Sequence, residues 1–197
     1  CGRNFEYFSE DPLLSGRLAG AWVRGAQRTG TGACLKHFAA NSQEYKRFSS
    51  DSVMDMRTLR EIYLTGFELA VKQSRPASVM CSYNRLNGEH ASDSRFLLTD
   101  ILRREWGFDG FVVTDWGALN DRTAALKAGC DLNMPGGSRY QVRKAMRDVR
   151  EGRLSVSEVD ACAERILNFI LRAQETLSEP CDMAAHHALA REAAEQG

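Results

Sequence analysis

The sequence predicts an α/β fold, a TIM-type (β/α)8 barrel of which the chain holds the later part. Four short apolar runs alternate with helical patterns along the 197 residues, which is typical of a parallel sheet covered by helices. Reactive side chains stand at the carboxyl ends of those runs, and in a barrel these ends surround a single mouth. No glycine-rich phosphate loop follows the first run, which disfavours the nucleotide-binding open sheets. A complete barrel has eight strands in about 250 residues, so four strands make up only a part.

The predicted strands are residues 33–38, 77–83, 110–114 and, with a weaker pattern, 130–134. Each is a short apolar run followed by polar or glycine-containing residues and then by a helical pattern. A strand that is apolar along its whole length is buried on both faces, so we expect parallel strands between helices.

Two helices can be predicted in detail. Over residues 56–74, apolar side chains fall on one face, and Thr58 with Glu61 has the form of a capping box. Over residues 94–107, Ser94 is the expected N-cap and Gly107 the expected end. The apolar faces consist of Leu59, Ile62, Tyr63, Phe67, Ala70 and Val71 in the first helix and of Leu97, Leu98, Ile101 and Leu102 in the second. Further helices are expected near residues 15–28, 120–128, 138–151 and 156–177.

Charge and hydropathy disfavour several classes of protein. Lysine plus arginine number 26, as do aspartate plus glutamate, so no basic excess is available for a nucleic-acid partner. No apolar run approaches the ~20 residues that cross a bilayer, so no membrane partner is expected. The six cysteines form no C-x-x-C pair and are predicted to be reduced core residues without a metal, and with the neutral charge they favour a cytoplasmic location. They are Cys1, Cys34, Cys81, Cys130, Cys162 and Cys181.

A carboxylate and an aromatic ring follow the third predicted strand. Asp115 comes directly after GFVVT, where it either caps the next helix or enters a site at the barrel mouth. The indole face of Trp116 could pack on the C–H groups of a pyranose, although a tryptophan taken alone is more often part of a core. Gly117 permits close approach of a ligand or an unusual backbone angle.

Cationic side chains lie near the first predicted strand. Lys36 and His37 point to opposite faces if that strand is regular, but a strand end or a bulge can bring both to the mouth. Arg47 follows in the next loop, and Arg3 precedes both in GRNFE. Such donors, aimed at several hydroxyls, suit a polyhydroxylated ligand.

Several motifs in sequence carry a family resemblance. GRNFEYFSEDP, CLKHFAANSQE, TLREIYL, VMCSYNRLNG and LLTDILRREWGFDGFVVTDWGA occur in this order. Together they make the chain resemble the first domain of family 3 glycoside hydrolases, the β-glucosidase and β-xylosidase group, over essentially its whole length. The resemblance implies that Asp115 is the catalytic nucleophile and that Trp116 lines the subsite for the terminal sugar. It also implies that Arg3, Lys36, His37 and Arg47 bind sugar hydroxyls and that Tyr83 hydrogen-bonds the nucleophile.

The implied reaction is retaining, exo-acting hydrolysis of a β-linked terminal glucose or xylose through a covalent glycosyl-aspartate, with no cofactor. In that family the general acid is usually a glutamate of a second, α/β sandwich domain. We therefore expect residues 1–180 to be part of the barrel domain and residues 181–197 to be a helical linker to that absent domain. Carboxylates on candidate mouth loops are Glu6, Glu10, Glu44 and Asp51, and the resemblance assigns none of them the role.

Alternatives to this interpretation remain. The N-acetylglucosaminidase branch of the family carries a KHFPGHG-type motif, and KHFAANSQE stands here instead, which disfavours that branch. Phosphorolysis would need an anion site that the sequence does not reveal. The alternative from a different class is a non-catalytic or inactive barrel fragment that lacks its general acid and at most binds sugar.

Overall fold

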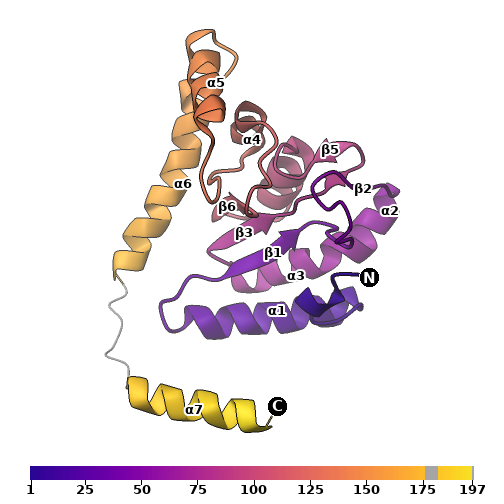
Figure 1. Cartoon of the computed structure of the whole chain (residues 1–197), viewed down its shortest axis with the longest axis vertical. Helices are drawn as coiled ribbons and strands as arrows, with labels where there is room; N and C mark the ends of the chain where they lie inside the picture. The colour runs from indigo at the N-terminus through magenta and orange to yellow at the C-terminus, as the bar shows by residue number, and fades with distance from the viewer. Residues whose placement is uncertain (176–181, 197) are drawn as a thin grey trace.

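The computed structural model describes residues 1–175 and 182–196. Its central sheet has three parallel strands in the order β1 (Cys34–Phe38), β3 (Ser78–Cys81) and β6 (Phe111–Thr114). The fourth predicted strand is reduced to a parallel bridge between Leu132 and Val113 of β6. The predicted runs are thus parallel neighbours in chain order (Figure 1). This arrangement confirms an α/β fold, and the barrel stays a prediction.

Helices pack against this sheet. In Figure 1, α1 and α3 lie side by side below the strands, and α6 runs along the other end of the sheet, next to β6. The helices are η1 (Asn4–Glu6), α1 (Pro12–Gln27), α2 (Met56–Thr58), η2 (Leu59–Leu64), α3 (Thr65–Ser74), η3 (Phe96–Glu105), α4 (Arg122–Ala128), α5 (Arg139–Arg150), α6 (Val156–Glu175) and α7 (Met183–Gln196). Stretches η2 and η3 are π-helical, and α2, η2 and α3 together make the helix predicted over 56–74.

One predicted helix start and one predicted cap are wrong, each because an aspartate caps the helix earlier. The Asp11 carboxylate accepts the Leu13 N–H at 2.7 Å, so α1 begins at Pro12 and not near residue 15. The Asp55 carboxylate accepts the Thr58 N–H at 2.7 Å, so the predicted capping box of Thr58 does not form. The end predicted at residue 177 lies outside the described residues.

The second detailed helix prediction is confirmed. The Ser94 hydroxyl accepts the Leu97 N–H at 3.3 Å, and Gly107 follows the helix with a φ of +72°. All four predicted apolar residues of η3 are fully buried. In the earlier helix Ile62 is 52% exposed, which contradicts its predicted place on the buried face.

A small second sheet joins two loops above the central strands. It consists of β2 (Asp51–Ser52), β4 (Arg85–Leu86) and β5 (Glu89–His90), with β2 parallel to β4 and β5 antiparallel. Asn87 and Gly88, with φ values of 50° and 92°, form the hairpin turn that an Asn-Gly pair favours. This sheet ties the loop after β1 to the loop after β3.

The cysteine and surface predictions have mixed outcomes. Cys81, Cys130 and Cys162 are buried, but Cys1 is exposed, so that prediction is wrong for Cys1. Cys34 is half-buried, and Cys181 lies outside the described residues.

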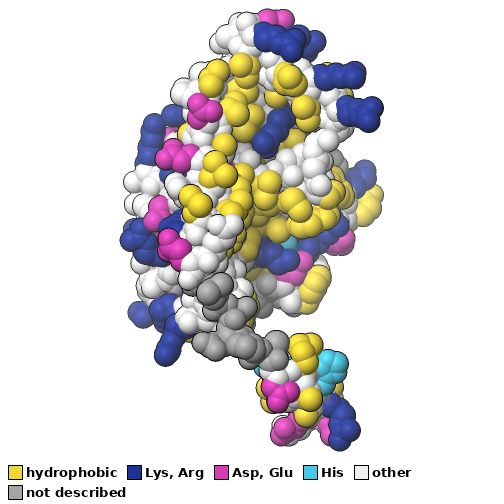
Figure 2. Space-filling model, turned by 90° about the vertical axis from the view of Figure 1, so that its left-hand side faces the viewer, with side chains coloured by type: hydrophobic (Ala, Val, Ile, Leu, Met, Phe, Trp, Pro, Cys, Tyr) yellow, Lys and Arg dark blue, Asp and Glu magenta, His cyan; other side chains and the backbone are white. Residues whose placement is uncertain are grey.

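Within residues 1–175 and 182–196, no helix is both long and apolar enough to span a membrane. Figure 2 shows a band of hydrophobic side chains on the side of the molecule where α6 runs. The exposed hydrophobic residues of α6 include Leu167, Ile170 and Leu171.

Candidate active site

Asp115 lies where β6 ends, and the local backbone holds it there. Its N–H donates to the Cys81 carbonyl of β3 at 3.2 Å, and its own carbonyl accepts the Ala118 N–H at 2.9 Å. Gly117 has a φ of +80°, a conformation that glycine adopts readily. The helix that follows is capped by Asp121, not by Asp115. The capping interpretation of Asp115 is therefore wrong.

Asp115 is 8% exposed, and each oxygen of its carboxylate has a partner. Its Oδ1 accepts the Trp116 N–H at 2.7 Å, and its Oδ2 lies 3.2 Å from His37 Nε2. The Tyr83 hydroxyl interacts with the same carboxylate. Burial raises the pKa of Tyr83, and the Asp115 charge adds to this shift, so the hydroxyl stays a donor at neutral pH.

His37 reaches Asp115 because β1 is irregular at its end. The register between β1 and β3 shifts between Leu35 and Phe38, as the expected bulge requires. His37 is 2% exposed, and its Nδ1 lies 3.3 Å from Glu6 Oε2. Burial lowers the pKa of His37, while the carboxylates of Glu6 and Asp115 oppose that shift.

The two site arginines share a carboxylate. Arg3 is 4% exposed, donates from Nε to Glu6 Oε2 at 3.0 Å and also donates to Glu44. Arg47 Nη1 lies 3.4 Å from Glu44 Oε2, and the Arg47 guanidinium stacks over the Tyr83 ring at 4.5 Å. These contacts connect the loop after β1 and the η1 segment to the residues around Asp115.

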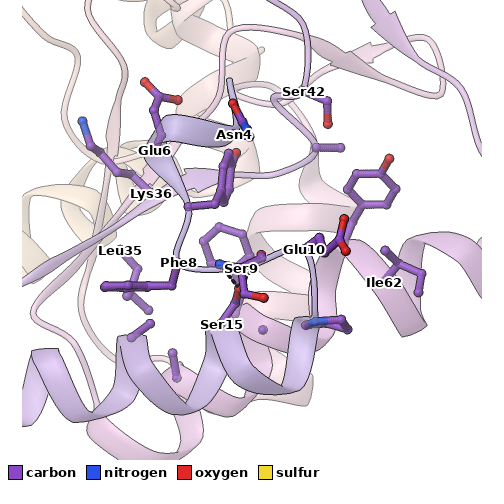
Figure 3. A pocket seen from close by; sticks show the side chains of 18 of the residues that line it. Asn4, Glu6, Phe8, Ser9, Glu10, Ser15, Leu35, Lys36, Ser42 and Ile62 are labelled. Atoms are coloured by element: carbon purple, nitrogen blue, oxygen red, sulfur yellow. Dashed lines mark hydrogen bonds between the residues drawn. The ribbon is translucent and has the colours of Figure 1, made fainter. Parts of the chain in front are cut away.

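Lys36 is the predicted site residue that the structure sets apart. Among the described residues it forms no ion pair, and its exposed side chain lines a cavity of about 680 Å³. Figure 3 shows Lys36 and Glu6 at one edge of this cavity, both directed away from α1. Neither Asp115 nor His37 lines it. Burial is the main cause that lowers the pKa of His37, and the Lys36 charge acts in the same direction. The cavity adjoins the Asp115 site without being part of it.

Trp116 is 51% exposed. The expectation that a lone tryptophan packs in the core is therefore wrong here. Its backbone N–H anchors the Asp115 carboxylate, while its indole stays accessible beside it. An accessible ring next to a buried carboxylate is an arrangement suited to binding an apolar sugar face.

The match of a family model decides which family this arrangement belongs to. The model of the glycosyl hydrolase family 3 N-terminal domain matches residues 1–169. The chain belongs to glycosyl hydrolase family 3. The loops and strand ends described above all lie within the matched range.

Members of glycosyl hydrolase family 3 that resemble the chain are mostly named β-glucosidases. The chain is 54% identical over 196 residues to the thermostable beta-glucosidase B of Acetivibrio thermocellus and 44% identical to an exo-alpha-(1->6)-L-arabinopyranosidase of Bifidobacterium breve. Each match covers 98% of the chain and 26% of the relative, so the chain spans about a quarter of these curated relatives. A structure of beta-glucosidase 3B from Thermotoga neapolitana in complex with glucose superposes with a TM-score of 0.89 at 46% identity, covering 98% of this chain and 28% of that one.

The contacts that the predicted site residues make with one another and with their neighbours could not be predicted from the sequence. The Glu6–His37–Asp115 contacts join η1, β1 and the end of β6, and no local pattern signals them. Phe48, whose ring lies 4.5 Å from that of Tyr83, was also not predicted. No group of three or more side chains in residues 1–175 and 182–196 is arranged to bind a metal ion.

Proposed function

We propose that the chain carries the nucleophile of a retaining, exo-acting glycoside hydrolase that releases a β-linked terminal glucose or xylose. The proposal includes a barrel to which residues 1–180 contribute, and residues 181–197 as a helical linker to a second domain. Its main support is the buried Asp115 carboxylate at a strand end, with the Trp116 N–H on one oxygen and His37 against the other. The names of the relatives support the substrate class, and the more identical of the two described above is the β-glucosidase.

Asp115 meets the needs of a nucleophile. A carboxylate that attacks carbon must be oriented and shielded from bulk water. The Trp116 N–H, the Tyr83 hydroxyl and the His37 imidazole surround Asp115 and leave it 8% exposed. A sugar stacked on the exposed Trp116 indole would bring its ring next to this carboxylate.

The proposed reaction has two displacements. Asp115 attacks the anomeric carbon, forming a carbon–oxygen ester bond while the bond to the leaving oxygen breaks, and a general acid protonates that oxygen. Water then attacks the same carbon and gives its proton to the deprotonated general acid, while the ester bond breaks to regenerate the Asp115 carboxylate. Two inversions leave the product with the starting configuration, and no step needs a cofactor.

The remaining predicted residues would bind the sugar hydroxyls. We assign this role to Arg3, Lys36, His37 and Arg47. Arg47 is the best supported, because its guanidinium is held over Tyr83 and its side chain is 29% exposed. Lys36 is exposed and forms no ion pair among the described residues, so its ammonium group is available to a ligand.

Three of the four carboxylates considered as a general acid within the chain, all but Glu10, already have structural partners. Glu6 accepts hydrogen bonds from Arg3 through both oxygens and lies across the imidazole from Asp115. Glu44 accepts from both arginines, and Asp51 accepts the Gly88 N–H at 3.0 Å. A retaining enzyme needs its second carboxyl about 5–5.5 Å from the first. These contacts support a general acid supplied by the second domain.

The first test is covalent trapping of the nucleophile. A 2-deoxy-2-fluoro glucoside with a good leaving group needs little acid assistance, so Asp115 should react without the second domain. We expect the intact mass of the chain to rise by one fluoro-sugar, and Asp115→Asn to abolish the gain. Asp109→Asn is the matched control, because Asp109 is an exposed carboxylate before the same strand and pairs with Arg75 at 2.7 Å.

The trapping result also decides the alternative function. A non-catalytic fragment that at most binds sugar is favoured by one observation, that the chain spans about a quarter of its curated relatives. Such a fragment would show wild-type circular dichroism but no mass gain, and this outcome would refute a competent nucleophile in this chain. Reagents with glucosyl, xylosyl and arabinopyranosyl groups, compared by labelling rate, would distinguish the sugar.

A further inference from the structure

Phe48 is an exposed aromatic residue to which the proposed reaction gives no role. It lies in the loop after β1, next to Arg47, and is 54% exposed. Single exposed apolar residues are common on protein surfaces and need no function. The position of Phe48 distinguishes it, because its contacts bring the ring to the edge of the Asp115 site.

The Phe48 ring belongs to a cluster with Tyr83 and Arg47. Its centroid lies 4.5 Å from that of the Tyr83 ring, at an interplanar angle of 58°. The Arg47 guanidinium carbon lies 5.4 Å from the Phe48 centroid and 4.5 Å from the Tyr83 centroid. Tyr83 in turn interacts with the Asp115 carboxylate. Phe48 is therefore separated from the proposed nucleophile by one side chain.

Backbone hydrogen bonds fix the loop that carries Phe48. Lys46 has a φ of 52°, and its carbonyl accepts the N–H groups of Ser49 and Ser50 at 2.8 and 2.9 Å. The Ser50 carbonyl accepts the Arg85 N–H at 2.9 Å, which ties this loop to the small sheet. A ring on such a loop loses little conformational freedom when a ligand packs against it.

The ring also borders the turn that follows Asp115. The Phe48 Cε1 atom lies 4.0 Å from the position that a Cβ on Gly117 would take. The residue before Gly117 is Trp116, which is exposed as well. Two exposed aromatic residues, Phe48 and Trp116, therefore lie at the outer edge of the Asp115 site.

Burial distinguishes the inner part of the site from this edge. The residues to which we assign sugar hydroxyls include Arg3 and His37, and both are buried. A terminal sugar needs several hydrogen bonds, so it binds among these inner donors. The group attached to that sugar then extends toward solvent, and the side chains exposed there are aromatic. An aromatic ring packs well against a flat apolar face.

We propose that Phe48 is a specificity-determining residue that packs against the leaving group and favours one with a flat apolar face, such as an aryl ring or a pyranose. The inference rests on the proposed function, because it needs Asp115 to displace a leaving group. Arg47 and Tyr83 hold the Phe48 ring in place. Phe48 contributes to the binding of the leaving group and takes no part in bond formation at the anomeric carbon.

The test compares two trapping reagents that differ only in the leaving group. Both carry the 2-deoxy-2-fluoro glycosyl group that labels Asp115 fastest, and they release either fluoride or 2,4-dinitrophenolate. Fluoride has no ring to pack on Phe48, whereas dinitrophenolate has one. Labelling rates are followed by intact mass at low reagent concentration. In Phe48→Ala the ratio of the dinitrophenyl rate to the fluoride rate should fall about 5-fold, as expected for one lost aromatic pair.

Two further variants test whether the aromatic face at this position is responsible. Phe48→Trp keeps an aromatic face, so its ratio should stay within about 2-fold of the wild type. Tyr45→Ala is the matched control, because Tyr45 is an exposed aromatic residue of the same loop whose ring packs with the Lys46 ammonium group at 5.4 Å. Its ratio should equal that of the wild type.

An unchanged ratio in Phe48→Ala would overturn the inference. Equal slowing with both reagents gives this result, and it would mean that Phe48 only supports Tyr83. If Phe48→Ala fails to fold by circular dichroism, Phe48→Leu removes the aromatic face at a similar volume and gives the same comparison. Failure of both reagents to label the wild type refutes the proposed function, whereas normal labelling with an unchanged ratio refutes only the role of Phe48.

Discussion

Asp131 is a buried carboxylate whose removal should strongly destabilise the chain. It lies 2% exposed beside β6, the strand that ends at Asp115. Its Oδ2 accepts the Val112 N–H at 2.6 Å and an Arg103 N–H at 2.7 Å, while its Oδ1 accepts the Arg165 Nε–H at 2.8 Å. One side chain therefore joins β6 to η3 and α6.

The size of the effect follows from what Asp131→Ala leaves behind. The Arg103 and Arg165 side chains are only 13% and 24% exposed, so two guanidinium groups would lose their counter-charge while largely buried. Removing one partner of a buried ion pair costs about 3–5 kcal/mol. A domain is stable by about 5–15 kcal/mol in total. Water can reach part of Arg165, which places the expected loss toward the lower end, about 3 kcal/mol.

The measurement is urea unfolding followed by circular dichroism and by the fluorescence of the chain's tryptophans, of which Trp106 is buried. Asp100→Ala is the control, because Asp100 pairs with Arg104 at 2.9 Å on the surface, where a pair contributes about 0–1 kcal/mol. A loss below about 1 kcal/mol in Asp131→Ala, at an unchanged slope with urea, would refute the argument that these arginines depend on Asp131.

Two other predictions concern the backbone and pH. Gly117→Ala should lower the free energy of unfolding by about 1 kcal/mol, because φ is +80°, while the added Cβ would contact only Phe48, at 4.0 Å. Gly25→Ala, where the added Cβ lies in open space on α1, should instead raise the free energy of unfolding. Burial lowers the pKa of His37, so the unfolded chain binds this proton first as pH falls below about 6.5, and the free energy of unfolding should decrease there. His37→Gln should make that decrease shallower in acid titrations of stability, and an unchanged slope would contradict it.

The regular elements could be predicted because their signals are local. Three of the four apolar runs became strands, and the η3 leucines with Ser94 and Gly107 behaved as the helix pattern indicates. The errors arose where two local signals competed. Asp55 caps the helix in place of Thr58, and the Asn87–Gly88 turn signal, present in the sequence, was not used to predict the small sheet.

The sequence by itself determined the family resemblance, the strand-end position of Asp115 and the types of residue around it. Periodicity, caps and motifs depend on neighbours in the chain, so they can be recognised without a fold. Only the tertiary structure decided that His37 lies between Asp115 and Glu6, that the Trp116 residue is exposed and that Lys36 lines a cavity that Asp115 does not share. His37 and Asp115 come from strands separated by β3. Burial and distance between such residues depend on how the whole chain packs, and burial is the main cause that lowers the pKa of His37.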